Sequence, residues 1–363
     1  DAPGDAIGMS IHLSADGTTL AVSFPGNGKG YVRIYRYEIT VGAWKQLGQT
    51  LEGKQDGEGF GASVSMTRHG DSVAIGSPYY NDAKHNFEAC GRVAGFDLVR
   101  SRWVQLGGSV VGQQNNARLG HSLCMADDGR LFVSGAPFDS SQFTEAGIFF
   151  SFIFGPDAED MLTEVGVDKT DLNVSDKSYQ QLLTAVSGDT SYDHFGAVLA
   201  CDSDANSVVS SAIEDDQVRL YTVGGVRWIR SGHITPDDSD GKGNGHAMDI
   251  SPRSEVIVTA TRNYNGTVGQ IFNVIPVGFS QSYAMGQTLG GDEILGQDDW
   301  IRDGPSVSLG EEGVTLAIGY ESILLLDDDY SNAFVGNQSS LSVVRVYSYG
   351  STTSSFWLGM DNV

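Results

Sequence analysis

The chain has 363 residues and a formal net charge of −24 at pH 7, with 47 glycines and 9 prolines. This negative charge argues against nucleic acid or an anionic membrane as partner, and it favours a well-solvated surface over a preference for cations or basic partners. The longest near-apolar run, at 147–155, is too short to span a bilayer and is typical of a buried strand. Evenly spread glycines predict many short strands and turns.

A repeated unit runs along the chain and starts at a glycine that we call the leading glycine. Six leading glycines recur at intervals of about 50 to 75 residues, a length that fits the four-stranded blade of a β-propeller. They are Gly8, Gly61, Gly120, Gly196, Gly245 and Gly304. Small residues follow two positions later (Ser10, Ser63, Ser122, Val198, Ala247, Ser306) and large apolar ones three positions later. This alternation predicts a first strand whose small side chains lie in a crowded place, such as the innermost strands around an axis.

Three further strands are expected in each unit. After a tight turn, an almost wholly apolar second strand is predicted at 20–25, 73–78, 132–137, 208–213, 256–261 and 316–321. Third strands are predicted at 31–37, 92–98, 148–154, 217–223, 267–274 and 343–349. Fourth strands carry an aromatic residue followed by Leu-Gly, as at 44–53 and 103–112, and we expect Trp44, Trp103, Trp228 and Trp357 to pack one blade on the next.

The predicted fold class is all-β: a single β-propeller domain over 1–363 with six four-stranded blades, or seven as the alternative. The six blades are expected at 1–53, 54–112, 113–188, 189–234, 235–291 and 292–363. The last residues, LGMDNV, lead into DAPGDAIGMS as one internal blade leads into the next, so the ring is expected to close with adjacent termini. A segment at 155–181 is predicted as an insertion in the third blade, with a short helix near its start.

The repeat resembles the FG-GAP family of β-propeller repeats, which occur in integrin α-subunit heads and in many secreted or surface proteins. The resemblance rests on Phe60-Gly61 with Gly76-x-Pro78, on Phe195-Gly196, and on the Gly-Ala-Pro at 135–137, and it covers essentially the whole chain. It implies the fold and leaves the function open.

Integrin-type repeats place a calcium loop in the first hairpin, and this chain departs from that pattern. Its hairpins are shorter, and the closest match, at 202–206, lacks the closing glycine and acidic residue. Calcium needs six or more oxygen ligands, so no cofactor is predicted. If calcium binds at all, the acidic loop at 236–244 is the better place.

The cysteines and sequons bear on the cellular compartment. Cys124 and Cys201 lie in apolar strand patterns and are expected to be buried free thiols, with one disulfide plus one free thiol among the three cysteines, Cys90 included, as the alternative. No CxxC pair is present, which argues against a zinc site. Sequons at Asn173, Asn265 and Asn337 are candidate glycosylation sites. The sequence starts at Asp1, which a removed signal peptide or a trimmed chain would explain. Together with the low number of lysines and this start, the three sequons favour a secreted, cell-surface or lumenal protein.

Long variable loops should emerge on one face of the propeller, and they mix aromatic residues with carboxylates. Candidate ligand-face residues are Tyr79, Tyr80, Phe138, Tyr192, Asp298, Asp299, Trp300 and Tyr330. Such loops favour a non-enzymatic recognition or assembly module for a protein or glycan partner. One alternative is a glycan-acting hydrolase or lyase with an axial pocket, for which His121, His194 and His246 were considered, although no catalytic motif is present. The other alternative is a structural subunit of a surface assembly.

Overall fold

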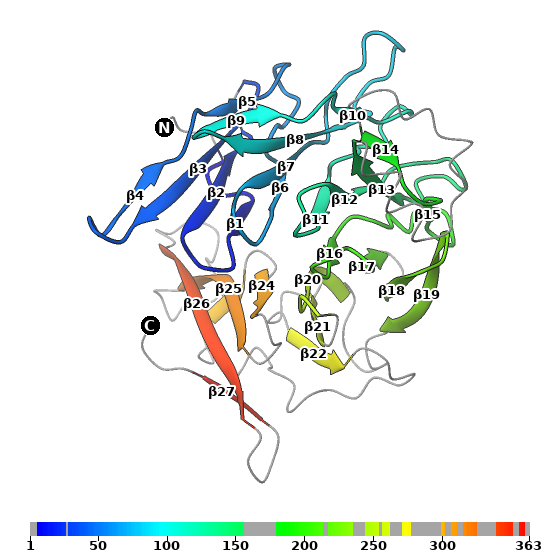
Figure 1. Cartoon of the computed structure of the whole chain (residues 1–363). Helices are drawn as coiled ribbons and strands as arrows, with labels where there is room; N and C mark the ends of the chain where they lie inside the picture. The colour runs from blue at the N-terminus through cyan, green and yellow to red at the C-terminus, as the bar shows by residue number, and fades with distance from the viewer. Residues whose placement is uncertain are drawn as a thin grey trace. The chain divides into compact units, whose positions relative to one another are not determined.

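The computed structural model consists of β-strands, and the residues that it describes contain no helix, so none that is long and apolar enough to cross a membrane (Figure 1). The described residues are 6–26, 28–155, 179–212, 217–234, 244–253, 256–261, 271–276, 299–301, 306–310, 315–324, 339–350 and 356–359. The chain divides into two compact units. The first consists of Asp1–Ala212 with Tyr221–Arg230, and the second of Ile213–Leu220 with Ser231–Val363.

Three antiparallel sheets of the first unit follow one plan, in which the third strand pairs with the second strand and with two short strands that replace a single fourth strand. The first sheet contains β1 (Ile11–Leu13), β2 (Thr19–Phe24), β3 (Tyr31–Glu38), β4 (Ala43–Gln46) and β5 (Leu51–Glu52). The second contains β6 (Ser63–Met66), β7 (Ser72–Ser77), β8 (Arg92–Val99), β9 (Arg102–Gln105) and β10 (Val110–Val111). The third contains β11 (Ser122–Met125), β12 (Leu131–Ala136), β13 (Ile148–Phe154), β14 (Tyr179–Gln181) and β15 (Val186–Ser187).

The remaining sheets extend into the second unit. The fourth sheet contains β16 (Leu199–Cys201), β17 (Ser207–Ala212), β18 (Gln217–Gly224) and β19 (Arg227–Ile234), and the boundary between the units crosses its last two strands. The fifth contains β20 (Asn244–Ile250), β21 (Val256–Thr261) and β22 (Ile271–Pro276). The sixth contains β23 (Asp299–Ile301), β24 (Ser306–Leu309), β25 (Thr315–Leu324), β26 (Ser339–Gly350) and β27 (Phe356–Gly359).

The glycines of the repeat are needed because neighbouring sheets approach each other through bare backbone. A Cβ added to Gly76 would lie 2.1 Å from the carbonyl oxygen of Gly120, and one added to Gly135 would lie 1.9 Å from that of Gly196. The leading glycines Gly120 and Gly196 both have a φ of 85°, which favours glycine. The Gly-x-Pro glycine of one unit and the leading glycine of the next therefore form one close contact.

The small residues two positions after the leading glycine also join neighbouring sheets. The Ser63 hydroxyl donates to the carbonyl oxygen of Gly120 at 2.8 Å, and the Ser122 hydroxyl donates to that of Gly196 at 2.7 Å. Both serines are buried. The first strands β6, β11 and β16 lie beside one another, so the crowding that the alternation predicts is present where these strands meet.

Two of the tryptophans pack one sheet on the next, as expected. Trp103 is 3% exposed, and its Nε1 donates to the Leu47 carbonyl oxygen of the first sheet at 2.9 Å. The buried Trp228 ring meets that of Phe149 in the third sheet edge-on, with centroids 5.5 Å apart. Trp44 is 42% exposed and contacts Tyr37 of its own hairpin with the rings tilted by 58°, so the expectation of a packing role was wrong for Trp44 in the first unit. The side chain of Trp357 lies outside the described residues.

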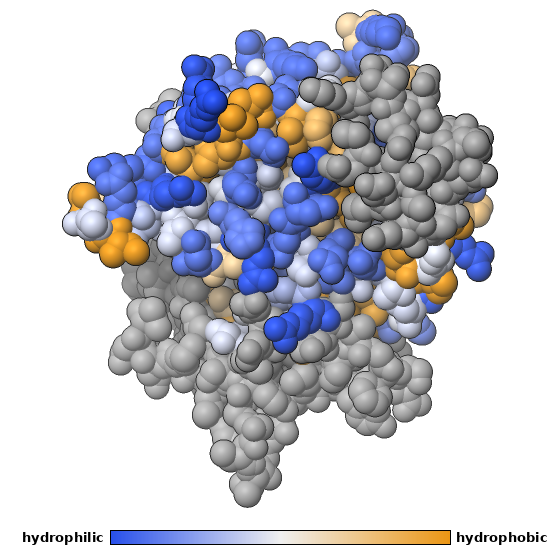
Figure 2. Space-filling model, in the orientation of Figure 1, coloured by the Kyte–Doolittle hydropathy of each residue, from blue (hydrophilic) through white to orange (hydrophobic). Residues whose placement is uncertain are grey.

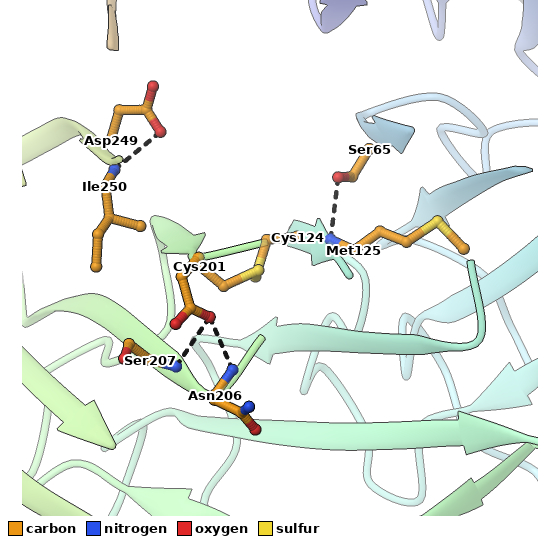
Figure 3. Close-up of a disulfide and its surroundings, with 9 residues drawn as sticks. Ser65, Cys124, Met125, Cys201, Asn206, Ser207, Asp249 and Ile250 are labelled. Carbon is orange, nitrogen blue, oxygen red and sulfur yellow. Dashed lines mark hydrogen bonds between the residues drawn. A yellow bond between two sulfur atoms is a disulfide. The ribbon is translucent and has the colours of Figure 1, made fainter. Parts of the chain in front are cut away.

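A disulfide joins Cys124 of β11 to Cys201 of β16, so the expectation of two free thiols was wrong and its alternative, one disulfide, is what the structure shows (Figure 3). The physical reason is that β11 and β16, the first strands of two consecutive repeat units, lie side by side. The Cα atoms of Cys124 and Cys201 are 5.9 Å apart, which is within reach of a disulfide. Cys90 is the remaining, buried free thiol. One sheet earlier, the same strand-to-strand relation is a hydrogen bond from the Met125 amide to the Ser65 hydroxyl at 3.1 Å.

Several predicted segments differ from the structure or lie outside it. Residues 179–181, the end of the predicted insertion, form β14 and pair with β13. The rest of the insertion with its helix, at 156–178, lies outside the described residues, as do almost all of the acidic loop and the residues at both termini. The predicted domain boundaries and the closure of the ring stay predictions.

Candidate functional site

Four side chains from successive loops of the first unit stack on one another, and we call them the aromatic ladder: Tyr79, Arg118, Phe138 and His194. Two of them, Tyr79 and Phe138, directly follow the proline of the Gly-x-Pro motif. The other two, Arg118 and His194, stand two residues before a leading glycine and have φ values of 59° and 49°. The corresponding residue of the preceding repeat is Gly59, with a φ of 68°. The same left-handed position therefore recurs in three consecutive joins, by which we mean the segments that connect one sheet to the next.

The contacts within the ladder are close. The Arg118 guanidinium carbon lies 5.2 Å from the Tyr79 ring centroid and 4.0 Å from that of Phe138, which are cation–π distances. The Phe138 and His194 rings have centroids 4.8 Å apart. His194 continues the contacts to a carboxylate, with its Nε2 3.2 Å from Glu145 Oε2. Loops far apart in the sequence are thus held in one row by their side chains.

The Arg118 guanidinium contacts two rings and has its donors unused. Its central carbon lies over the Tyr79 and Phe138 rings, so the guanidinium is engaged in two cation–π contacts. Its Nε is buried and has no hydrogen-bond partner, and within the described part of the chain no carboxylate or carbonyl oxygen is paired with its nitrogens. Arginine presents its donors in the plane of the guanidinium, so stacking leaves them directed at the edge of the ladder.

His121 follows this arginine by three residues, and its imidazole is neutral at pH 7. Its amide donates to the Arg118 carbonyl oxygen at 3.1 Å. Burial, and secondly the positive charge of Arg118, lower the pKa of His121 from 6.5 to about 4. At neutral pH this imidazole therefore adds no second charge beside the arginine.

A second arginine that contacts two rings, Arg92, is the first residue of β8 and has a partner inside the protein. Its Nη2 donates to Glu58 Oε1 at 2.7 Å, and the two side chains are 3% and 0% exposed. The guanidinium lies over the rings of Phe60 and Tyr80, at 5.6 and 5.1 Å from their centroids. The Glu58 carboxylate also accepts hydrogen bonds from the backbone amides of Lys54 and Gln55 and so closes the turn between the first two sheets.

The structure brings together some of the predicted ligand-face residues and separates others. Tyr79 and Phe138 belong to the ladder, whereas the half-buried Tyr80 covers the internal ion pair. Tyr192 is 53% exposed on the loop before β16 and has a left-handed backbone. In the second unit, Asp299 and Trp300 form part of β23 instead of the expected loop. Outside the described residues lie Asp298 and Tyr330, as well as the sequon residues Asn173, Asn265 and Asn337.

Two residues of the ladder and its surroundings, Arg118 and Glu145, were not among the predicted site residues. Arg118 had a signal, because it occupies the same place relative to its leading glycine as His194 does. Glu145 had none, since its partner His194 is 49 residues away. Of the other histidines considered, His121 lies beside Arg118 and His246 lies in the second unit.

The turn at 202–206 uses its first carboxylate for its own backbone. Asp202 Oδ1 accepts from the amides of Asn206 and Ser207 at 2.8 and 3.0 Å. Among the described residues, no three His, Cys, Asp or Glu side chains gather in a way that could hold a metal ion.

A second exposed feature is apolar and lies on the first sheet. On the face drawn in Figure 2, hydrophilic side chains cover much of the described surface, and an orange cluster lies at the tip of the β3–β4 hairpin. Ile39 and Val41, in that turn, are 78% and 58% exposed. These side chains offer apolar area without donors or acceptors, so the ladder is the richer candidate for specific recognition.

Comparison with solved structures decides the fold. A candidate 6-phosphogluconolactonase from Bacteroides uniformis matches with a TM-score of 0.59 at 13% identity, covering 98% of this chain and 84% of its own. The periplasmic gluconolactonase of Pseudomonas aeruginosa matches with a TM-score of 0.54 at 14% identity, covering 92% and 84%. Sqt1 of Chaetomium thermophilum, solved with the N-terminus of a ribosomal protein, matches at 0.50 and 15%, covering 89% and 72%.

The chain is a β-propeller. The predicted fold class is confirmed by these neighbours and by the repeated antiparallel sheets, whereas the number of blades stays a prediction. Identities this low show the fold and no more. No protein-family model and no curated protein matches the sequence, so the resemblance to FG-GAP repeats is supported at the level of the propeller alone.

Proposed function

We propose that this propeller is a non-enzymatic recognition module that binds its partner through the aromatic ladder. The observation that carries the proposal is the row of stacked side chains in which Arg118 is held between two rings with its donors unpaired among the described residues. Folding holds this arginine in place without using its hydrogen-bonding capacity. Side chains fixed in this way lose little entropy when a ligand binds.

The partner class that suits the ladder best is a glycan. Tyr79 is 45% exposed, and a flat aromatic ring offers an apolar face to the C–H groups of a sugar while neighbouring polar groups take its hydroxyls. A protein partner is the other possibility, and Sqt1, the neighbour solved with a segment of a ribosomal protein, shows that a propeller of related shape serves that role. We further propose the FG-GAP type of repeat and a secreted, cell-surface or lumenal location, on the sequence features given above.

A glycan array tests the proposal. The wild-type protein and the double variant Tyr79→Ala/Phe138→Ala are applied to immobilised saccharides, with Tyr37→Ala as the control, because Tyr37 is also an exposed aromatic residue but belongs to the β3–β4 hairpin. We expect binding to at least one saccharide that the double variant loses and the control keeps. Binding that is unchanged in the double variant, or no binding to any saccharide by the wild type, contradicts the proposal.

A second candidate function is hydrolysis of a sugar lactone. Two neighbours are described as lactonases of this kind, and the ladder contains one possible acid–base pair, His194 with Glu145 at 3.2 Å. The measurement is opening of D-glucono-1,5-lactone above the spontaneous rate. Turnover that Glu145→Gln abolishes would favour this candidate over simple binding, and a rate equal to the spontaneous one would exclude the reaction.

A further inference from the structure

We propose that Arg118 binds the carboxylate of an acidic sugar, so that the ligand of the aromatic ladder is a uronic acid rather than a neutral glycan. The inference rests on the proposed function of the ladder and adds the chemical group that the ligand must carry. It follows from the geometry of the guanidinium, from an ion pair elsewhere in the molecule, and from the overall charge of the chain.

The two ring contacts restrict how a ligand can approach the arginine. The centroids of Phe138 and Tyr79 lie 4.0 and 5.2 Å from the guanidinium carbon, so a ligand that approaches in the guanidinium plane keeps both contacts. In that plane the group presents parallel N–H donors whose spacing matches the two oxygens of a carboxylate. Among the described residues nothing occupies this position, since the acid nearest in the ladder, Glu145, is paired with His194.

The protein itself shows which group can complete an arginine that contacts two rings. Arg92, the first residue of β8, lies over Phe60 and Tyr80 as Arg118 lies over Phe138 and Tyr79, and its Nη2 donates to the Glu58 carboxylate. Arg118 has no such partner among the described residues. A ligand carboxylate would give Arg118 the kind of contact that Glu58 gives Arg92.

The charge and the exposed ring decide which carboxylate. A net charge of −24 opposes a ligand with many negative charges more strongly than one with a single acid group, so a single acid group is favoured. Because the pKa of His121 is held at about 4, Arg118 does not share its ligand with a charged imidazole there. The 45% exposed Tyr79 ring ends the row and can take the apolar face of a pyranose whose carboxylate meets Arg118.

Isothermal titration calorimetry with small ligands tests the inference directly. D-glucuronate is compared with D-glucose, which has the same ring without the acid, with acetate, which has the acid without the ring, and with inorganic phosphate. We expect D-glucuronate to bind about tenfold tighter than each of the other three, the usual value of one charge-assisted hydrogen-bonded contact. Equal affinity for glucose and glucuronate, or tighter binding of phosphate, overturns the inference.

Variants separate the role of the arginine from that of the rings. Arg118→Gln should lose the preference for glucuronate over glucose, and Arg118→Lys should restore only part of it, because lysine keeps the charge but lacks the planar pair of donors. The control is Arg102→Gln, which removes the same charge from an exposed position on β9. Circular dichroism confirms folding of each variant. A preference that persists in Arg118→Gln overturns the inference.

The two proposals fail in different ways. If neutral saccharides bind and depend on Tyr79 and Phe138 while charge has no effect, the ladder is a recognition site and the acidic ligand is wrong. If glucuronate binds but the Tyr79→Ala/Phe138→Ala variant retains full affinity, the site lies elsewhere and the proposed function of the ladder is wrong as well.

Discussion

Two arginines of the first unit, Arg92 at the start of β8 and Arg118 in the loop before β11, each contact two aromatic rings and differ in their hydrogen bonds. Their guanidinium carbons lie 4.0 to 5.6 Å from the ring centroids. Arg92 is completed by the buried carboxylate of Glu58, whereas Arg118 meets no carboxylate among the described residues. Both arginines thus contact two rings, and only Arg92 has an internal acid; we propose that Arg118 is available to a ligand for this reason.

The joins between sheets show where the internal acid comes from. Three residues before the leading glycine, the first join has Glu58 and the third has Asp193, and both accept backbone amides of the turn before them. The middle join has Ala117 at this position. An acid at this place closes the turn between two sheets, and the join without it carries Arg118.

The largest effect is expected from removing the internal acid. Glu58→Ala leaves Arg92 buried without its carboxylate, which should lower the free energy of unfolding by about 3–5 kcal/mol. Urea unfolding measures it, with Glu52→Ala as the control, since Glu52 is an exposed acid on β5. A loss below about 1 kcal/mol would mean that Arg92 is not a structural residue.

A smaller effect is expected at the third join. Asp193 accepts from the amides of Asp189 and Thr190 and from the Thr190 hydroxyl, three neutral donors that would lose their acceptor. Asp193→Ala should therefore cost about 1–3 kcal/mol. Amide hydrogen exchange at Asp189 and Thr190 should accelerate with the loss of stability, and unchanged protection there would contradict the capping role.

Replacing Arg118 should lower the free energy of unfolding by less than either of these changes. Arg118→Gln loses two cation–π contacts at a partly exposed site, about 1 kcal/mol in total, and it relieves a buried Nε without a partner. In the same urea experiment this variant should remain more stable than Glu58→Ala. If it is as unstable as Glu58→Ala, Arg118 is a structural residue and the contrast between the two arginines fails.

The smallest effect is expected on the titration of His121. Its pKa in the folded protein is about 4, so between pH 6.5 and 4 the unfolded chain takes up a proton that the folded protein does not, and stability falls as the pH falls through this range. Since the charge of Arg118 is the second cause, Arg118→Gln should raise the pKa of His121 by less than burial lowers it. The imidazole chemical shifts of His121, followed by NMR as the pH changes, measure this pKa. An unchanged pKa in Arg118→Gln would mean that the guanidinium lies too far from His121 to influence it.

The sequence was sufficient for the fold because the repeat is a local pattern. Leading glycines, small residues in the first strand and Gly-x-Pro motifs recur at regular positions, and the structure gives them one physical cause: the approach of neighbouring backbones, as between Gly76 and Gly120. The disulfide was left open because pairing Cys124 with Cys201 depends on which first strands are neighbours, and the sequence separates these residues by 77 positions.

The site was only partly predictable, for a similar reason. Tyr79 and Phe138 were predicted from the aromatic character of their loops. Arg118 was missed because a stacked arginine is defined by rings that lie 39 residues before it and 20 after it, and no local pattern reports such contacts. Tyr80 is next in sequence to Tyr79 but covers the internal ion pair. The composition of the loop does not distinguish a tyrosine with this structural role from one that faces a ligand.

The most direct test is a crystal structure of the protein soaked with D-glucuronate beside one without ligand. The account predicts that the sugar carboxylate lies in the guanidinium plane of Arg118, with N–O distances of about 2.7–2.9 Å, and that Arg92 keeps Glu58 in both crystals. Sugar bound away from the aromatic ladder, or a protein carboxylate already paired with Arg118 in the ligand-free crystal, would contradict it.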